Sequence, residues 1–328
     1  MSGDEGIGWV YQLGFSIPLI WFSEGTLCVI ILHVIRRAVL LTIIAMLLSA
    51  CAASSAPTEG ASAAHYSIQN VGSDTMVNLA LAWAEAFQDE HPDTRIAVTG
   101  GGSGTGLAAL INGTIDIANA SRQIKNEEID RAEANKITPV EHIVARDAIA
   151  VIVHPSNLVE HLTLQQISDI YTGKITNWRQ VGGENRPIVL LSRESNSGTH
   201  VFFLEQVIRL GDSKNKVLFA PDTLLLPSSE GITAEVQQNP NAIGYDGLGY
   251  VTPAVKMVAV ARDAKGPFVL PSIESVNSKT YPIARDLYMY TVGRPTGQIA
   301  KYLEWIASSA GQEIVAKLGF VPYDASRQ

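Results

Sequence analysis

The sequence has almost no cysteine. Among its 328 residues only Cys28 and Cys51 are present, and both lie in the first sixth of the chain. Because nothing after residue 51 can form a disulfide or a thiolate metal site, cysteine chemistry cannot hold the fold together. The fold must therefore rest on a hydrophobic core. The chain is long enough for two core-forming domains, and its 46% hydrophobic and 17% charged residues are typical of a globular protein.

Long basic runs and metal-binding spacings are also missing. The formal net charge is −8 and no Lys/Arg cluster offsets it, which argues against a nucleic-acid partner. The seven histidines are scattered, and His154 and His161 do not have the spacing of a metal pair, so we expect no metal and no cofactor. The glycine-rich run 100–106 lacks the lysine of a P-loop, and Ser103 within it is one glycine short of a nucleophile elbow.

The N-terminal part of the chain has the features of a targeting signal. Two arginines at 36–37 precede the apolar run 38–47, and the small residues that follow end at Cys51. A charged region, an apolar region and a small-residue cleavage site form a secretory signal, and the cysteine makes it resemble a bacterial lipoprotein signal. We therefore expect residues 1–51 to target the membrane, Cys51 to carry a lipid, and the protein to be lipid-anchored on the extracytoplasmic face of the cell membrane. The alternative is an ordinary membrane anchor that ends in a chance cysteine.

Two further features surround this signal. Residues 52–65 are rich in Ala and Ser, which predicts a flexible tether. Upstream, a second apolar stretch at 13–35 leaves residues 1–35 unexplained, because signals normally begin the chain. Either translation starts later, near Val34, or the stretch is a true additional membrane segment.

The segment 193–199 is the most informative part of the remaining chain. It reads Arg-Glu-Ser-Asn-Ser-Gly-Thr, and it follows a short apolar run at 188–191 and precedes a mostly apolar helical pattern at 201–208. The first amide groups of a helix have no partner within it and carry the positive end of its dipole. Hydroxyls and free N–H groups at Ser197, Gly198 and Thr199, with the guanidinium of Arg193, therefore predict an oxyanion site.

Three other junctions between a strand pattern and a helix pattern carry small hydroxyl residues. They are residues 67–75, 95–106 and 116–122. In open α/β sheets, ligands bind at the carboxyl ends of strands, so these junctions and the 193–199 segment predict one shared site.

The alternation of strand and helix patterns from residue 66 predicts an α/β fold with largely parallel strands. Two long β-branched runs, at 144–153 and 255–260, are expected to be strands that cross between two lobes. We therefore predict lobe I over residues 66–147 plus 256–328, and lobe II over residues 148–255.

The chain resembles the PstS-like phosphate-binding proteins, the substrate-binding components of ABC phosphate importers, over residues 66–323. Singly the motifs are weak, but their number and order make the resemblance specific. It implies a bilobal periplasmic-binding-protein fold of type II, with a hinge, phosphate in the cleft and an ABC permease as partner; we also expect a monomer. The motifs that carry it are residues 72–75, 100–106, 116–122, 162–167, 171–178, 193–199, 242–245, 281–285 and 319–322.

The resemblance also implies which residues contact phosphate. In this chain they are Ser73, Asp74, Thr75, Ser103, Ser121, Arg193, Ser197, Gly198 and Thr199.

One position departs from the family pattern. Some members have an aspartate that accepts the proton of hydrogen phosphate where this chain has Arg122. Arg122 is a candidate contact, but it could equally be a rim residue or belong to a surface ion pair. Asp74 is our candidate for the acceptor, and a simple helix-capping role is its alternative. A buried acceptor would favour hydrogen phosphate over sulfate, which has no proton to donate at neutral pH.

The expected function is an extracytoplasmic receptor that delivers phosphate to an ABC transporter and performs no chemistry. One alternative is a receptor for another oxyanion, such as sulfate or molybdate. A second is a phosphomonoesterase on the same fold, which would need a metal or an activated nucleophile that the sequence does not indicate. A third is a phosphate sensor that acts on a signalling partner.

Overall fold

The structure is a computed structural model that describes residues 66–324. The expected targeting segment 1–51, with its lipidation site Cys51, and the expected tether 52–65 lie outside the described residues. Strands and helices alternate along most of the described chain, as the sequence pattern predicts for an α/β fold. The strands are β1 (Tyr66–Gly72), β2 (Thr94–Thr99), β3 (Ile117–Ala120), β4 (Pro139–Val153), β5 (His161–Thr163), β6 (Val189–Arg193), β7 (Leu224–Leu226), β8 (Ala242–Gly247), β9 (Lys256–Met257), β10 (Ala259–Ala261) and β11 (Ala284–Val292).

Helices follow most of these strands. The 3-10 turn η1 precedes the α-helix α2, and α6 continues directly into the π-helical η3. The helices are η1 (Asp74–Met76), α2 (Val77–Glu90), α3 (Ser103–Ile111), α4 (Asn126–Ala134), α5 (Leu164–Tyr171), η2 (Trp178–Val181), α6 (Gly198–Phe203), η3 (Leu204–Ile208), α7 (Ser229–Gln238), η4 (Leu248–Tyr250), α8 (Ile273–Asn277), α9 (Gly297–Ala307) and α10 (Ser309–Lys317).

The main sheet is mixed. Its strands follow the order β2-β1-β3-β11-β4-β8-β6-β7, with β9 paired to β4 outside this path. β1 is parallel to β2 and β3, and β6 is parallel to β7 and β8. β4 is antiparallel to both β8 and β11, and a separate small sheet pairs β10 with β5.

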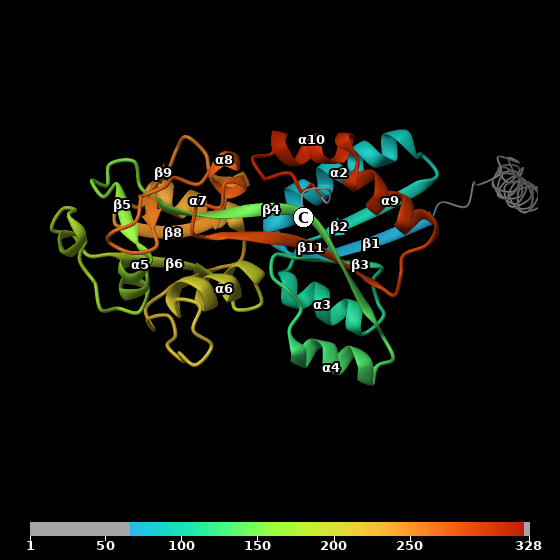
Figure 1. Cartoon of the computed structure of the whole chain (residues 1–328), viewed down its shortest axis with the longest axis horizontal. Coiled ribbons are helices and arrows are strands. Elements are labelled where there is room, and N and C mark those ends of the chain that lie inside the picture. Colours follow the sequence, from blue (N-terminus) through green and yellow to red (C-terminus); the bar gives the residue numbers. More distant parts are fainter. Residues whose placement is uncertain (1–65, 325–328) are drawn as a thin grey trace, which may run out of the picture. The chain divides into compact units, whose positions relative to one another are not determined.

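β4 joins two halves of the sheet. Its residues up to Ala148 pair with β11, and from Ile149 onward they pair with β8. We use lobe I for residues 66–148 and 284–324, and lobe II for residues 149–283. In Figure 1 lobe II lies on the left and lobe I on the right, with β4 and β11 between them.

Lobe II contains a segment that the sequence led us to assign to lobe I. We expected the chain to cross back at 255–260, which would have given residues 256–328 to lobe I. In the structure the apolar run at 255–261 forms two short strands, of which β10 pairs with β5, and Val258 and Tyr281 pack in the core of lobe II. The strand that returns to lobe I is β11 instead.

Helices cover both faces of the lobe I sheet, with α2, α9 and α10 on one face and α3 and α4 on the other (Figure 1). Leu79, Trp83 and Phe87 on α2 are completely buried, at the helical spacing seen in the sequence, whereas Ala86 is only partly buried. Burying each such side chain contributes roughly 1.5–3 kcal/mol. This packing fixes the start of α2, and with it the loop after β1.

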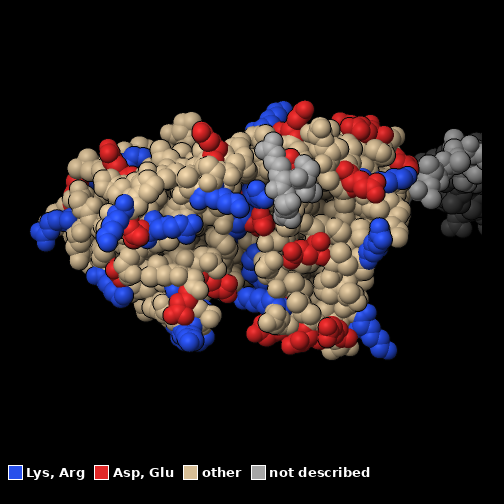
Figure 2. All heavy atoms as spheres, viewed as in Figure 1, with Lys and Arg blue, Asp and Glu red and all other residues tan. Residues whose placement is uncertain are grey.

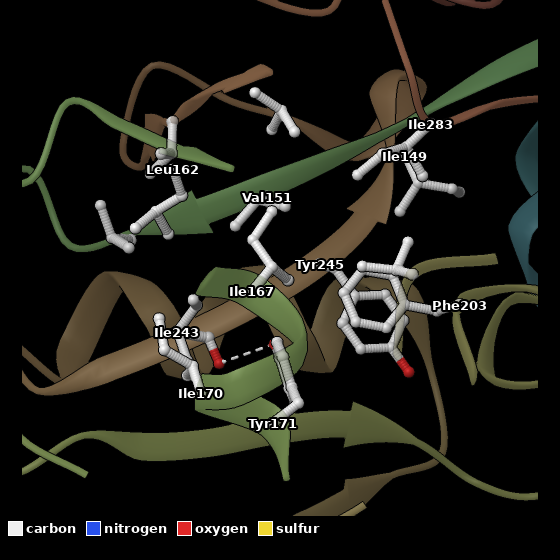
Figure 3. Packing of buried hydrophobic residues seen from close by; sticks show 14 of the residues in the cluster. Ile149, Val151, Leu162, Ile167, Ile170, Tyr171, Phe203, Ile243, Tyr245 and Ile283 are labelled. Atoms are coloured by element: carbon white, nitrogen blue, oxygen red, sulfur yellow. Dashed lines mark hydrogen bonds between the residues drawn. The ribbon is translucent and has the colours of Figure 1, made fainter. Parts of the chain in front are cut away.

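The core of lobe II supports the helix that follows the 193–199 segment. Phe203 of α6 stacks on Tyr245 of β8 with ring centroids 3.6 Å apart (Figure 3). The hydroxyl of Tyr171 donates to the backbone oxygen of Ile243 at 3.3 Å, so α5 is tied to the same strand. Trp178 is also buried in this core.

Candidate functional site

The four strand-to-helix junctions identified in the sequence meet at the boundary between the lobes. β1, β2 and β3 are parallel, so the loops that follow them leave the same edge of the lobe I sheet. The loop after β6 approaches this edge from lobe II, where the backbone N–H of Gly104 donates to the backbone oxygen of Asn196 at 3.0 Å. Segments far apart in the chain therefore lie together at the boundary between the lobes.

Three serine hydroxyls from three loops of lobe I lie together. The hydroxyl of Ser73 donates to that of Ser121 at 2.9 Å, and the hydroxyl of Ser103 lies 3.3 Å from the same oxygen. Ser103 also accepts the backbone N–H of Ser121 at 3.0 Å. All three side chains are buried, so their hydroxyls have been taken out of bulk water. We call these three residues the serine cluster.

Gly198 of lobe II packs directly against the serine cluster. A Cβ at this position would lie 2.3 Å from the hydroxyl oxygen of Ser103 and 2.6 Å from that of Ser121. A side chain at residue 198 would therefore separate the lobes, and glycine allows the backbone to approach closely. The neighbouring Ser197 caps α6, since its hydroxyl oxygen accepts the backbone N–H groups of Thr199 at 3.2 Å and His200 at 3.5 Å.

Two threonines extend the site across the boundary. The hydroxyl oxygens of Thr75, in lobe I, and Thr199, in lobe II, lie 2.6 Å apart, and both side chains are buried. The site thus contains hydroxyls from both lobes in direct contact.

The side chain of Arg193 is completely buried and donates hydrogen bonds to four groups of the protein. Its Nη2 donates to the Asp74 carboxylate at 2.9 Å and to the backbone oxygen of Pro227 at 2.7 Å. Its Nη1 donates to the hydroxyl of Ser229 at 2.8 Å, and its Nε to the backbone oxygen of Leu226 at 3.3 Å. Arg193 therefore belongs to the site, but most of its five N–H groups already have protein acceptors.

Asp74 links lobe I to this guanidinium. One carboxylate oxygen is bonded to Arg193, and the other accepts the backbone N–H of Gly101 at 2.8 Å. Ser73 is the capping residue of η1 and makes no side-chain cap bond, while Asp74 is the first residue of that turn. The role shown for the Asp74 side chain is thus to connect the loop after β1 with the glycine-rich loop and with lobe II, rather than to cap a helix.

Arg122 is turned toward a carboxylate instead of the serine cluster. Its Nη1 and Nη2 donate to the two oxygens of Glu128, each at 2.8 Å. Burial by itself would raise the pKa of Glu128, but the hydrogen bonds and charge of Arg122 hold that pKa below its ordinary value. Of the roles left open by the sequence, the structure shows an ion pair, and that pair is buried.

Arg285 and Asp147 complete the site and were missed in the sequence. Arg285 Nη2 lies 3.0 Å from the Thr199 hydroxyl, and Nη1 donates to the backbone oxygen of Ser121 at 2.8 Å. Its Nη2 is 2.9 Å from the Asp147 carboxylate. Burial raises the pKa of Asp147 above its ordinary value, and Arg285 opposes that rise. Arg285 is part of the motif at 281–285, but nothing in that motif indicated that it would contact the site.

Residues 66–324 contain neither a candidate metal-ligand cluster nor a helix suited to crossing a membrane. Within residues 66–324, no group of three or more His, Cys, Asp or Glu side chains is placed to hold a metal ion. No helix in the same range is long and apolar enough to cross a membrane. His200 is bonded to the Ser192 hydroxyl at 3.1 Å, and burial lowers its pKa.

Comparison with known proteins identifies the family. The profile of the PBP superfamily domain matches residues 53–310. The phosphate-binding protein PstS of Pseudomonas aeruginosa is 33% identical over 275 residues, which cover 79% of this chain and 83% of that protein. The PstS of Bacillus subtilis is 32% identical over 252 residues, which cover 76% of this chain and 79% of that protein.

Solved structures give the same result. A protein from Clostridium perfringens, named as a phosphate ABC transporter substrate-binding protein and solved with bound phosphate, is 35% identical with a TM-score of 0.70. The match covers 79% of this chain and all of that one. An ABC-type phosphate transport receptor from Vibrio cholerae is 28% identical with a TM-score of 0.63, over 78% of this chain and all of the receptor. The bilobal α/β fold with a mixed sheet and the sequence matches together place this chain in the PBP superfamily, among the PstS-like phosphate-binding proteins.

Proposed function

We propose that this protein is an extracytoplasmic receptor that binds inorganic phosphate between its two lobes and delivers it to an ABC transporter. The proposal rests on one observation: the serine cluster, Thr75, Gly198 and Thr199 are buried together at the boundary between the lobes. A small tetrahedral anion suits such a site, because it needs many donors arriving from different directions.

The donor chemistry supports an oxyanion as ligand. Removing a dianion from water is very costly unless its charge is compensated by hydrogen bonds and by cations. Each hydrogen bond to a charged group contributes roughly 1.5–3 kcal/mol net. The hydroxyls of the site can rotate, so they can exchange the bonds that they make with one another for bonds to an anion. Half a dozen such bonds would support a micromolar or tighter complex, at about −8 kcal/mol or beyond.

The charged groups of the site support phosphate in particular. Arg285 places a guanidinium against the Thr199 hydroxyl, and Arg193 places a second one against the Asp74 carboxylate. Asp74 places a carboxylate at the edge of the same site, where an oxygen can accept the proton of hydrogen phosphate. Sulfate offers no such proton at neutral pH, so this carboxylate would repel it.

Delivery, rather than chemistry, is the role that the family supports. The Clostridium and Vibrio relatives are named as components of phosphate transport. We therefore propose a monomer that passes phosphate to the permease subunits of an ABC transporter without reacting with it. A lipid on Cys51 would keep the receptor at the membrane surface, with residues 52–65 as the tether.

Isothermal titration of the full chain with phosphate, arsenate and sulfate tests the proposal. We expect phosphate and arsenate to bind with micromolar or lower Kd and sulfate to bind at least about 100-fold more weakly, a difference of about 2.7 kcal/mol. Asp74→Asn should narrow the preference for phosphate over sulfate. Equal binding of sulfate and phosphate by the wild type would contradict the phosphate assignment, and turnover of a chromogenic phosphate ester would contradict the non-catalytic role.

A further inference from the structure

Arg285 lies where the two lobes join. It is on β11, and its register partner on β4 is Asp147, one residue before β4 changes from β11 to β8 as its neighbour. Both side chains are almost completely buried. Asp147 holds Arg285 through Nε at 3.3 Å and Nη2 at 2.9 Å, and its other oxygen accepts the backbone N–H of Leu248 in lobe II.

From this position Arg285 reaches groups of both lobes. In lobe I it donates to the backbone oxygen of Ser121 at 2.8 Å and lies 3.5 Å from the Thr75 hydroxyl. In lobe II it contacts the Thr199 hydroxyl at 3.0 Å. Asp147 and Ser121 are strong, fixed acceptors, whereas a threonine hydroxyl can rotate and give up its place to a charged acceptor.

Arg193 differs from Arg285 in how firmly its acceptors are held. Its acceptors are two backbone oxygens, the Ser229 hydroxyl and the Asp74 carboxylate. The two backbone oxygens are fixed by the main chain, and the Asp74 carboxylate is also held by the backbone N–H of Gly101. Arg193 is therefore committed mainly to the protein, and Arg285 keeps donor capacity directed at the threonines.

The Arg285 side chain, although only 3% exposed, also borders a cavity between the lobes. It lines a cavity of about 380 Å³ together with Phe202, Lys125 and Arg122. The guanidinium carbon lies 5.4 Å from the centre of the Phe202 ring, which restricts its tilt. Figure 2 shows the surface hollowed between the lobes at the lower edge of the view, with charges of both signs along the rim. The same guanidinium thus borders both the opening and the hydroxyls.

We infer that Arg285 is an oxyanion-binding residue of this site and that Asp147 is the residue that positions it. With an oxyanion among the hydroxyls, Arg285 donates to it instead of to Thr199, and the Thr199 hydroxyl becomes a donor to the same anion. Because the anion then bonds groups of lobe I, lobe II and the connecting strand, its binding favours the closed arrangement. This inference rests on the proposed function.

Titration calorimetry with inorganic phosphate on full-length variants tests the inference. We expect Arg285→Gln to weaken phosphate binding at least 100-fold, because both the positive charge and the planar pair of N–H donors are lost. Arg285→Lys should weaken it about 10-fold, because it keeps the charge but loses the planar pair of donors. Asp147→Asn should also weaken binding, since it frees the guanidinium to turn away.

The adjacent pair on the same two strands is a matched control. Arg146 and Asp286 are register partners one residue along, with their side chains 3.2 Å apart and about one third exposed. Arg146→Gln removes an arginine from the same ladder without touching the hydroxyls, so phosphate affinity should stay within twofold of the wild type. A loss equal to that of Arg285→Gln would show that the strands, and not the Arg285 guanidinium, determine binding.

The remaining outcomes separate this inference from the proposed function. Wild-type protein that binds no phosphate would overturn both. Wild-type binding together with unchanged binding by Arg285→Gln and Arg285→Lys would overturn only the inference. If Arg285→Gln fails to fold, NMR of ¹⁵N-arginine-labelled wild-type protein still tests the inference. The guanidinium signal of Arg285 is the one that is missing from the spectrum of Arg285→Lys. This signal should shift when phosphate is added, and a signal that does not move would contradict the inference.

Discussion

Gly198 of lobe II packs directly against the serine cluster of lobe I. Its backbone conformation is open to alanine, but a Cβ would overlap two hydroxyl oxygens of the serine cluster. We expect Gly198→Ala to weaken phosphate binding at least tenfold by calorimetry, because the lobes cannot close fully around the ion. Since the overlap is between lobes, the free energy of unfolding without phosphate should change by less than about 1 kcal/mol.

Gly266→Ala is a suitable control for this variant. The nearest atom to a Cβ at residue 266 is 3.8 Å away, so the methyl group meets no obstacle. This control should bind phosphate like the wild type. Normal affinity in Gly198→Ala would show that the serine cluster and α6 separate when the ligand binds.

At the residue scale, local motifs predict what local geometry determines. Ser103, Gly198 and Thr199 could be identified because each lies in a short motif at a strand-to-helix junction. Arg285 could not, because its partners Asp147 and Ser121 are 138 and 164 residues away and it lies inside a strand. Arg122 was one candidate contact because it follows Ser121 in the sequence, but its side chain pairs with Glu128 in the first turn of α4.

At the scale of elements, the loop between β6 and α6 contacts the glycine-rich loop after β2 and is hydrogen-bonded to it. The side-chain amide of Asn196 donates to the backbone oxygen of Gly101 at 2.8 Å. A Cβ at Gly102 would lie 2.8 Å from the backbone oxygen of Asn196, so the loops are in contact. We expect Asn196→Ala to raise the phosphate dissociation rate about fivefold, equivalent to one hydrogen bond of about 1 kcal/mol, with little change in association.

Stopped-flow measurements distinguish this contact from a general effect on the loop. Ser195→Ala changes the exposed neighbouring residue and should leave both rates unchanged. A slower association rate in Asn196→Ala, with normal dissociation, would mean that the loop guides the ion inward and does not hold the lobes together.

The elements themselves were largely predictable, and their pairing was less so. The spacing of Leu79, Trp83 and Phe87 identifies the buried face of α2, because a helix repeats every 3.6 residues. The run at 255–260 has the composition of a buried strand, and it does form strands. Composition cannot show which strand pairs with this run. The return of the chain to lobe I was therefore expected at the run itself, about 25 residues before its actual position at β11.

At the scale of the whole molecule, each lobe has its own hydrophobic core. One core surrounds α2, α9 and α10 in lobe I and includes Tyr250 of lobe II, and the other surrounds α5, α6 and β8 in lobe II and includes Val321 of lobe I. Separate cores allow the lobes to remain folded while the contacts between them change. Polar contacts such as Thr75–Thr199 and Asp74–Arg193 join the lobes at the boundary, so an ion that bonds both sides can shift the balance between open and closed arrangements.

We expect the position of the molecule in the cell to depend on Cys51, which lies outside the described residues. If Cys51 is lipidated, mass spectrometry of the native protein should find an acylated cysteine as its first residue. Cys51→Ser should then move nearly all of the protein from the membrane fraction to the soluble fraction, because stable anchoring depends on the acyl chains. Cys28→Ser is the control and should stay with the membrane. Membrane retention of Cys51→Ser, with peptides from residues 1–30 present, would instead establish the upstream apolar stretch as the anchor.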